Sequence, residues 1–341
     1  MTTIKSFICG VSGKALTNEE RAFLVAEQPY GVILFARNVE SPAQVKALTD
    51  EIKAAITHPY LEILVDQEGG RVARLKPPHW RKYPTAQQLS QRLDAARAVY
   101  VNARLMAEEL RAVGITMDCA PVADVLAPEC HAIIGDRAFG DAPAQVITLA
   151  RAQAEGLHDE GILPVLKHIP GHGRATMDSH ETLPIVTATL AELEACDFAV
   201  FKALHDLPLA MTAHILYTAL DDKDCATFST KVMDYIRNEI GFNGLIMSDD
   251  LSMKALGGSF AERTMRALAA GCDLVLHGNG ALVGEPVRDL MAELREVAAA
   301  SVVLSPMALA RANAATDQRR APMPEQAPAL LAEWQQALAV A

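Results

Sequence analysis

The sequence predicts an α/β fold of the (β/α)8 (TIM) barrel class, and three observations lead to this prediction. Short apolar runs rich in Val, Ile and Leu alternate with longer amphipathic segments, which is the pattern of parallel strands joined by crossover helices. Eight such runs are present, and eight strands close a barrel. The length of 341 residues suits one barrel, and Gly and Pro are scattered without a low-complexity tract.

Strands, helix starts and long connections can be placed along the chain. The eight strands are expected at 4–9, 31–35, 62–65, 116–120, 163–166, 209–212, 244–247 and 274–276. Between them, capping residues mark helix starts, as at Thr17 and at Ser41, which is followed by a proline. Two connections, 67–86 and 124–143, are long and follow strand ends, where a barrel builds its active site.

The pattern after the eighth strand is helical over 283–300, 306–316 and 325–340. Because no strand pattern remains in this tail, we expect these extra C-terminal helices to pack on the barrel. Residues 1–341 are then expected to form a single domain.

Composition narrows the class of protein. The net charge of −11 argues against a nucleic-acid surface, because phosphate binding needs a basic stripe. The six cysteines are far apart, with no C-x-x-C pair and no ligand spacing for zinc, so we expect reduced core residues and no metal or other cofactor. There is no apolar stretch suited to a signal peptide or a membrane span. We therefore expect a cytoplasmic monomer that binds no membrane.

The stretch LPVLKHIPGHGRATMDSH, residues 163–180, holds the densest group of polar side chains. A strand-like apolar run leads to Lys167 and His168, and a glycine-rich loop then carries His172, Asp178 and His180. Burying these side chains without partners is costly, so an open cleft is their natural place.

Polar side chains also follow other predicted strands. Because the carboxyl ends of parallel strands meet at one end of a barrel, these residues are expected to converge there. Asp249 and Asp250 are adjacent on an extended segment, so only one of them can face the cavity, and Asp249 is predicted to be that one. The further residues of this group are Asp66, Glu68, Arg71, Arg74, His214, Ser248 and His277.

The motif KHIPGHGRATMDSH resembles the signature of glycoside hydrolase family 3, in the branch of single-domain bacterial β-N-acetylhexosaminidases. The segments GVILFARN, VDQEGGRVARL, APVADV, IIGDRAF and MSDDLSM agree with that branch, so the resemblance covers most of the first 280 residues.

The resemblance implies a role for each matching residue. It makes Asp249 the nucleophile and His180 the general acid/base, with Asp178 orienting His180. It makes His172 structural. The residues implied to bind the sugar are Asp66, Arg74, Arg137, Lys167 and His168.

The implied reaction is removal of a terminal non-reducing β-linked N-acetylglucosamine through a covalent glycosyl-aspartate, with retention at the anomeric carbon. The implied substrates are small glycans from peptidoglycan recycling, N-acetylglucosaminyl-1,6-anhydro-N-acetylmuramic acid with or without peptide.

Elementary chemistry fits these roles. An imidazole titrates near neutral pH, and a carboxylate partner such as Asp178 would fix its tautomer. Asp178 and His180 are two residues apart, so an extended loop places them on one side. Gly171 and Gly173 suggest a loop that closes over bound sugar.

Three other functions remain open on the residues alone. A phosphorylase is possible because a histidine tolerates an incoming phosphate better than a carboxylate does. A metal-dependent hydrolase would use His168, His214, His277 and Asp249, although Lys167 would repel the cation. A non-catalytic sugar-binding module would need neither Asp249 nor the Asp178/His180 pair.

Overall fold

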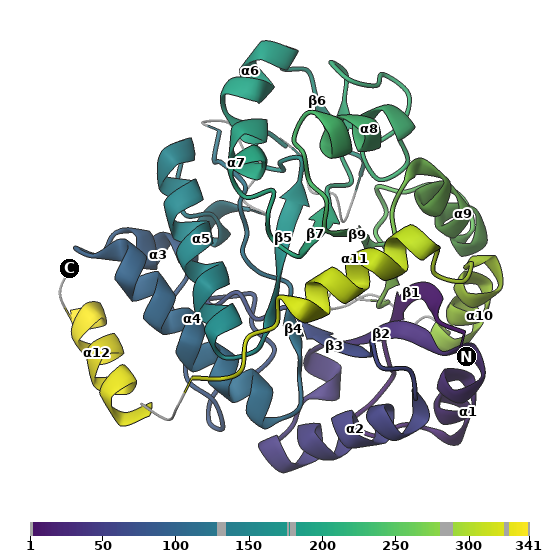
Figure 1. Ribbon diagram of the computed structural model, residues 1–341, viewed down its shortest axis with the longest axis horizontal. Helices are drawn as coiled ribbons and strands as arrows, with labels where there is room; N and C mark the ends of the chain where they lie inside the picture. Colours follow the sequence, from purple (N-terminus) through teal and green to yellow (C-terminus); the bar gives the residue numbers. More distant parts are fainter. Residues whose placement is uncertain are drawn as a thin grey trace.

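The computed structural model describes residues 3–127, 134–175, 177, 182–279, 289–323 and 327–339. Eight parallel strands form a closed barrel in the order β1-β2-β3-β4-β5-β7-β9-β10, with β10 pairing back to β1 (Figure 1). The barrel strands are β1 (Lys5–Cys9), β2 (Pro29–Leu34), β3 (Glu62–Val65), β4 (Met117–Asp118), β5 (Leu163–Ile169), β7 (Leu209–Thr212), β9 (Leu245–Asp250) and β10 (Leu274–His277). The predicted (β/α)8 barrel is confirmed.

Helices surround this barrel. They are α1 (Asn18–Glu27), α2 (Pro42–Ala55), α3 (Ala86–Ser90), α4 (Ala95–Ala112), α5 (Pro143–Asp159), α6 (Leu190–Ala195), α7 (Asp197–Ala203), α8 (Thr230–Asn238), α9 (Phe260–Ala270), α10 (Leu290–Ala300), α11 (Pro306–Asp317) and α12 (Ala327–Ala339). Thr17 caps α1 in a capping box with Glu20, and Ser41 caps α2, as their side chains predict. None of the described helices is both long enough and apolar enough to cross a membrane.

Three of the differences between the structure and the predicted strands matter here. Strand β5 continues through Lys167 and His168, and β9 continues through Asp249 and Asp250, so these polar residues lie in the strands rather than after them. Two short strands, β6 (Ile185–Val186) and β8 (Leu216–Tyr217), were not predicted and form a separate parallel pair. Two-residue strands are too short for a periodic pattern to indicate them.

The core has an inner and an outer layer. Alternate residues of the strands, such as Leu64, Val165 and Met247, pack in the barrel interior, whereas their neighbours pack against the surrounding helices. Helix α11 lies across one end of the barrel (Figure 1), and its Ala308 and Ala312 belong to the inner layer. The amino-terminal end is thereby covered, which leaves the carboxyl end for a site.

Helix α12 packs on α4 at the side of the barrel. The Trp334 indole donates a hydrogen bond of 2.9 Å to Asn102 Oδ1, and its ring lies edge-on to Tyr83, with centroids 6.0 Å apart. The C-terminal segment therefore packs as a helix, as expected. The predicted first residues of α10 and α12, 283–288 and 325–326, lie outside the described residues.

Candidate active site

The alternation of the strands decides which polar side chains face the barrel interior. Two residues beyond the inner-layer residues Leu64, Val165 and Met247, the same side of the chain carries a charged residue. These three charged residues are Asp66, Lys167 and Asp249. The barrel thus brings together, at its carboxyl end, three residues that are far apart in the sequence.

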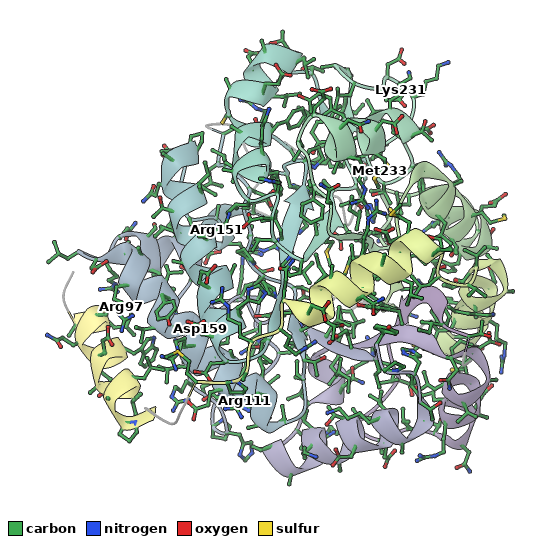
Figure 2. All side chains as sticks on the ribbon, viewed as in Figure 1. Arg97, Arg111, Arg151, Asp159, Lys231 and Met233 are labelled. Atoms are coloured by element: carbon green, nitrogen blue, oxygen red, sulfur yellow. The ribbon has the colours of Figure 1, made fainter. Side chains whose placement is uncertain are left out.

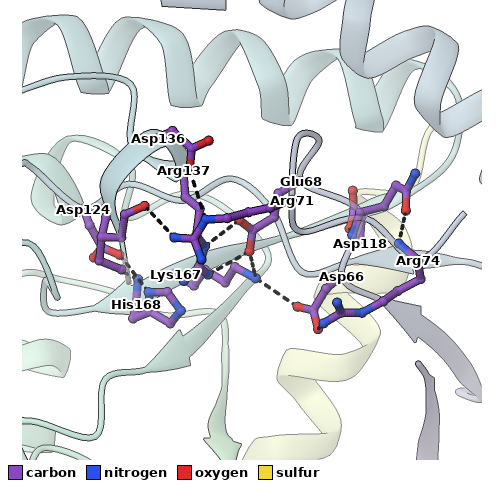
Figure 3. A network of polar contacts seen from close by, with 12 residues as sticks. Asp66, Glu68, Arg71, Arg74, Asp118, Asp124, Asp136, Arg137, Lys167 and His168 are labelled. Carbon is purple, nitrogen blue, oxygen red and sulfur yellow. Dashed lines mark hydrogen bonds and ion pairs between the residues drawn. The ribbon is translucent and has the colours of Figure 1, made fainter. Parts of the chain in front are cut away.

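A buried ion-pair cluster surrounds Lys167 (Figure 3). Its Nζ lies 3.0 Å from Asp66 Oδ1 and 2.6 Å from Glu68 Oε1. Arg74 donates to Asp66 Oδ2 at 2.9 Å, and Arg137 donates from Nε and from its terminal nitrogen to the two oxygens of Glu68, both at 2.8 Å. Four predicted sugar-binding residues are therefore in one network, and Glu68 connects two of them.

The charges of this cluster stabilise one another. Burial by itself would raise the pKa values of the Asp66 and Glu68 carboxyls, but Lys167 and the two arginines outweigh it, so the Asp66 pKa is well below its usual range and the Glu68 pKa falls to about 2. Burial alone would lower the pKa of Lys167, yet both carboxylates raise it above its ordinary value. All of these groups are consequently charged at neutral pH.

The turn after Glu68 requires both of its glycines. Gly69 and Gly70 have φ angles of +102° and +55°, and a Cβ on Gly69 would lie 2.3 Å from the Pro84 carbonyl oxygen. The amide of Gly70 donates to the Tyr83 carbonyl at 3.0 Å. The QEGG sequence therefore holds Glu68 on a tightly packed turn.

A second buried pair orients His168. Its Nδ1 lies 2.7 Å from Asp124 Oδ2, while Asp124 Oδ1 accepts hydrogen bonds from the backbone amides of His168 and His172. Burial would raise the Asp124 pKa, but the two histidines and the backbone amide of His172 lower it to about 2. Since Asp124 is an ionised acceptor, the Nδ1 of His168 carries the hydrogen of this bond.

Asp249 and Asp250 have different environments. Asp249 is partly exposed, and its Oδ1 accepts from the amide of Asp250 at 2.7 Å. Asp250 is buried, and its Oδ1 accepts from the amides of Ser252 at 2.9 Å and of Gly278 at 3.3 Å. Asp250 thus caps the following backbone.

The loop after β5 is anchored at its start. Tyr217 donates to the Gly171 carbonyl at 2.5 Å, and Arg174 pairs with the buried Asp197 at 2.6 Å. A Cβ on Gly173 would lie 1.7 Å from the carbonyl oxygen of Val125, so close packing accounts for this glycine. The predicted Asp178 and His180 lie outside the described residues.

Two further histidines at strand ends are fully buried and hydrogen-bonded. His214 Nδ1 lies 2.7 Å from Thr227 Oγ1, and its Nε2 lies 3.2 Å from the Asp250 carbonyl. His277 Nε2 lies 2.9 Å from Glu293 of α10. The expected convergence of His277 on the site is therefore wrong, because alternation turns its ring into the outer layer, on the side of Val275. His214 lies close enough to Asp249 and His168 for their charges to act on its pKa, which burial lowers. In the described part of the chain, no three His, Cys, Asp or Glu side chains are grouped to hold a metal ion.

Glu68 was expected among the polar residues at the strand ends but was given no role, and Asp124 was not predicted as a site residue. Both lie within segments that carry the family resemblance, VDQEGGRVARL and APVADV, but neither stands out by residue type. Their partners lie 69 residues away for Glu68 and Arg137, and 44 residues away for Asp124 and His168. The sequence signal for a role of these two residues was their acidic side chain, within the apolar segment APVADV for Asp124 and beside the two glycines of VDQEGGRVARL for Glu68.

Comparisons with known proteins identify the family of the chain. Residues 5–305 match the glycosyl hydrolase family 3 N-terminal domain. A β-hexosaminidase of Alkalilimnicola ehrlichii is 42% identical over 277 residues, which cover 78% of each chain. A β-hexosaminidase of Nitrosomonas eutropha is 41% identical over 278 residues, again 78% of each chain.

Solved structures show the same fold. Native NagZ from Neisseria gonorrhoeae superposes with a TM-score of 0.83 at 34% identity, covering 99% of this chain and 96% of that chain. A family 3 β-N-acetylglucosaminidase from Paenibacillus sp. has a TM-score of 0.83 at 26% identity, covering 97% of this chain and 67% of that chain. The resemblance found in the sequence is confirmed, and the chain belongs to glycosyl hydrolase family 3.

Proposed function

We propose that this protein is an exo-acting β-N-acetylglucosaminidase that removes a terminal non-reducing N-acetylglucosamine with retention at the anomeric carbon. The observation that carries the proposal is the charged cluster on the inner wall of the barrel. Of the three cations of this cluster, Arg74 has the most exposed side chain, 23%, so its guanidinium can meet a sugar oxygen.

The cluster can hold a sugar by its hydroxyl groups. Each oxygen of Asp66 accepts from one cation, Lys167 or Arg74, and retains a lone pair for a hydroxyl. Lys167 directs two of its three ammonium protons to Asp66 and Glu68, which leaves one for the ligand. A pocket that binds the outer hydroxyls in this way leaves no room for a longer chain, so cleavage is expected at the end of a glycan.

An N-acetylated hexosamine is favoured by the solved relatives. The neisserial NagZ has been crystallised with N-trifluoroacetyl-D-glucosamine, and the chain covers 99% of its own length in that comparison at 34% identity. The relatives named above are β-hexosaminidases. We therefore propose the same class of sugar here.

The proposed chemistry uses two residues on opposite sides of the sugar. Asp249 attacks the anomeric carbon and forms a glycosyl ester while His180 gives a proton to the leaving oxygen. His180, oriented by Asp178, then takes a proton from the water that breaks the ester. The inward side of β9 and the partial exposure of Asp249 support its part in this scheme.

The proposed natural substrates are muropeptide fragments that carry N-acetylglucosamine on 1,6-anhydro-N-acetylmuramic acid. We propose that the protein meets them as a cytoplasmic monomer. Cell fractionation and light scattering would test location and oligomeric state, and release of N-acetylglucosamine from the purified disaccharide would test the substrate.

The reaction class is tested with an aryl β-N-acetylglucosaminide. Hydrolysis with initial release of the β-anomer, followed by NMR, is expected. Phosphate should not yield a sugar phosphate, and a chelator should not reduce the rate. A sugar-phosphate product would indicate a phosphorylase, loss of activity with chelator a metal-dependent hydrolase, and binding without turnover a sugar-binding module.

The two catalytic residues are tested separately. Mass spectrometry after treatment with a slow 5-fluoro sugar substrate should find the label on the peptide that contains Asp249. His180→Ala should lose much less activity on an activated aryl leaving group than on a sugar leaving group, because a good leaving group needs little protonation. Equal losses on both substrates would exclude His180 as the acid.

A further inference from the structure

Glu68 is placed behind the proposed sugar-binding residues. Its side chain is only 6% exposed, and both of its oxygens accept from cations, Oε1 from Lys167 and Arg137 and Oε2 from Arg137 (Figure 3). A carboxylate in bidentate contact with a guanidinium and in contact with an ammonium has little capacity left for a ligand. Glu68 therefore acts on its cations, with no direct contact to the sugar required.

The three residues come from different parts of the barrel. Glu68 follows β3 on the Gly69-Gly70 turn, Lys167 lies in β5, and Arg137 lies in the short helical turn Gly135–Arg137 before α5. Glu68 thus connects the β5 side chain and Arg137 to the β3 turn, to which Arg71 also ties the same loop through Asp136 at 3.1 Å.

The charge balance of the cluster also depends on Glu68. Two carboxylates, Asp66 and Glu68, face three cations, Arg74, Lys167 and Arg137. Without Glu68, Lys167 would have Asp66 as its remaining carboxylate in the cluster and would move toward it. That movement would occupy Asp66 oxygens that the proposed function assigns to sugar hydroxyls, and Arg137 would lose its bidentate partner.

We propose that Glu68 is a positioning residue for substrate binding: it fixes Lys167 Nζ and the Arg137 guanidinium at the places where they meet the sugar. This inference rests on the proposed function. It concerns how the site is held together, so it can fail while the function stands.

The test compares two isosteric variants. Glu68→Gln keeps the shape of the side chain and removes its charge. Glu160→Gln is the matched control, because Glu160 accepts from the buried Arg104 at 3.0 and 2.5 Å and is also 6% exposed. It lies at the end of α5, 3.7 Å from Arg111, which Figure 2 labels at the periphery of the molecule.

Both variants should lose stability, since each leaves a buried cation without its ionised partner. Only Glu68→Gln should raise the KM for the aryl substrate and the Kd for free N-acetylglucosamine, with kcat/KM lower by at least about 10-fold. Thermal unfolding of both variants separates loss of fold from loss of binding.

Two results would overturn the inference. One is a Glu68→Gln protein with KM and kcat/KM within about 3-fold of the wild type. The other is a loss of kcat/KM that is equal in Glu160→Gln. If Glu68→Gln does not fold, Glu68→Asp is measured instead. This variant keeps the charge but its side chain is one methylene shorter, so it should raise KM. A KM equal to that of the wild type would overturn the inference. An inactive wild type would instead refute the proposed function.

Discussion

His168 and Asp124 form a hydrogen bond of 2.7 Å between Nδ1 and Oδ2, which directs the Nε2 edge of the ring away from Asp124. The tautomer of His168 is set by this contact, because ionised Asp124 can only accept.

Asp124→Asn should reverse that tautomer. The amide oxygen would keep accepting from the backbone amides of His168 and His172, so the NH2 group would face Nδ1 and force it to accept. We expect kcat/KM to fall by about 10-fold or more, and nitrogen NMR of labelled His168 should show hydrogen on Nε2. A variant with unchanged His168 nitrogen shifts and reduced activity would contradict this explanation.

Stability should fall in acid through the two buried carboxylates. The Glu68 pKa is lowered from 4.5 to about 2, and that of Asp124 from 3.8 to about 2. Because the pKa values of both carboxyls are lower in the folded state than in the unfolded state, their contribution to the free energy of unfolding is complete above about pH 4.5. This contribution is lost as the pH falls toward 2. The free energy of unfolding, measured with urea across this pH range, should decrease more steeply with falling pH for the wild type than for Glu68→Gln. Equal slopes would show that Glu68 does not contribute to the loss of stability in acid.

Asp249→Asn and Asp250→Asn should separate chemistry from structure. The first removes the proposed nucleophile, so kcat should fall by more than about 1000-fold with little change in unfolding. The second removes the negative charge of a buried carboxyl whose Oδ1 accepts from two backbone amides, so its main effect should be a lower unfolding midpoint. If Asp250→Asn were the inactive protein and Asp249→Asn the active one, the assignment of the inward residue would be wrong.

Gly173→Ala should destabilise the start of the loop after β5. The added Cβ would lie 1.7 Å from the Val125 carbonyl oxygen, and relief of that overlap requires the backbone to move. We expect a loss of about 2 kcal/mol in the free energy of unfolding, together with reduced activity. Gly257→Ala is the control, since its Cβ would meet nothing within 4 Å. Equal effects of the two substitutions would show that the packing against Val125 is unimportant.

Local patterns were enough for the barrel and for much of the site. The apolar runs identified all eight barrel strands, because a buried parallel strand needs a run of apolar residues along the chain itself. Because adjacent residues of an extended segment face opposite sides, the sequence already indicated that only one carboxylate of the Asp249-Asp250 pair faces the cavity, and the alternation with Leu245 and Met247 in the structure puts Asp249 on the inner side.

The sequence by itself thus determined the fold class, the family and the strands that carry the site. Only the tertiary structure decided that Glu68 joins Lys167 to Arg137, that Asp124 orients His168, and that His277 points outward to Glu293. The physical reason is distance along the chain. Periodicity reports which side of a strand a residue occupies, whereas its partner across the barrel depends on how strands and loops that are tens of residues apart come together when the barrel closes.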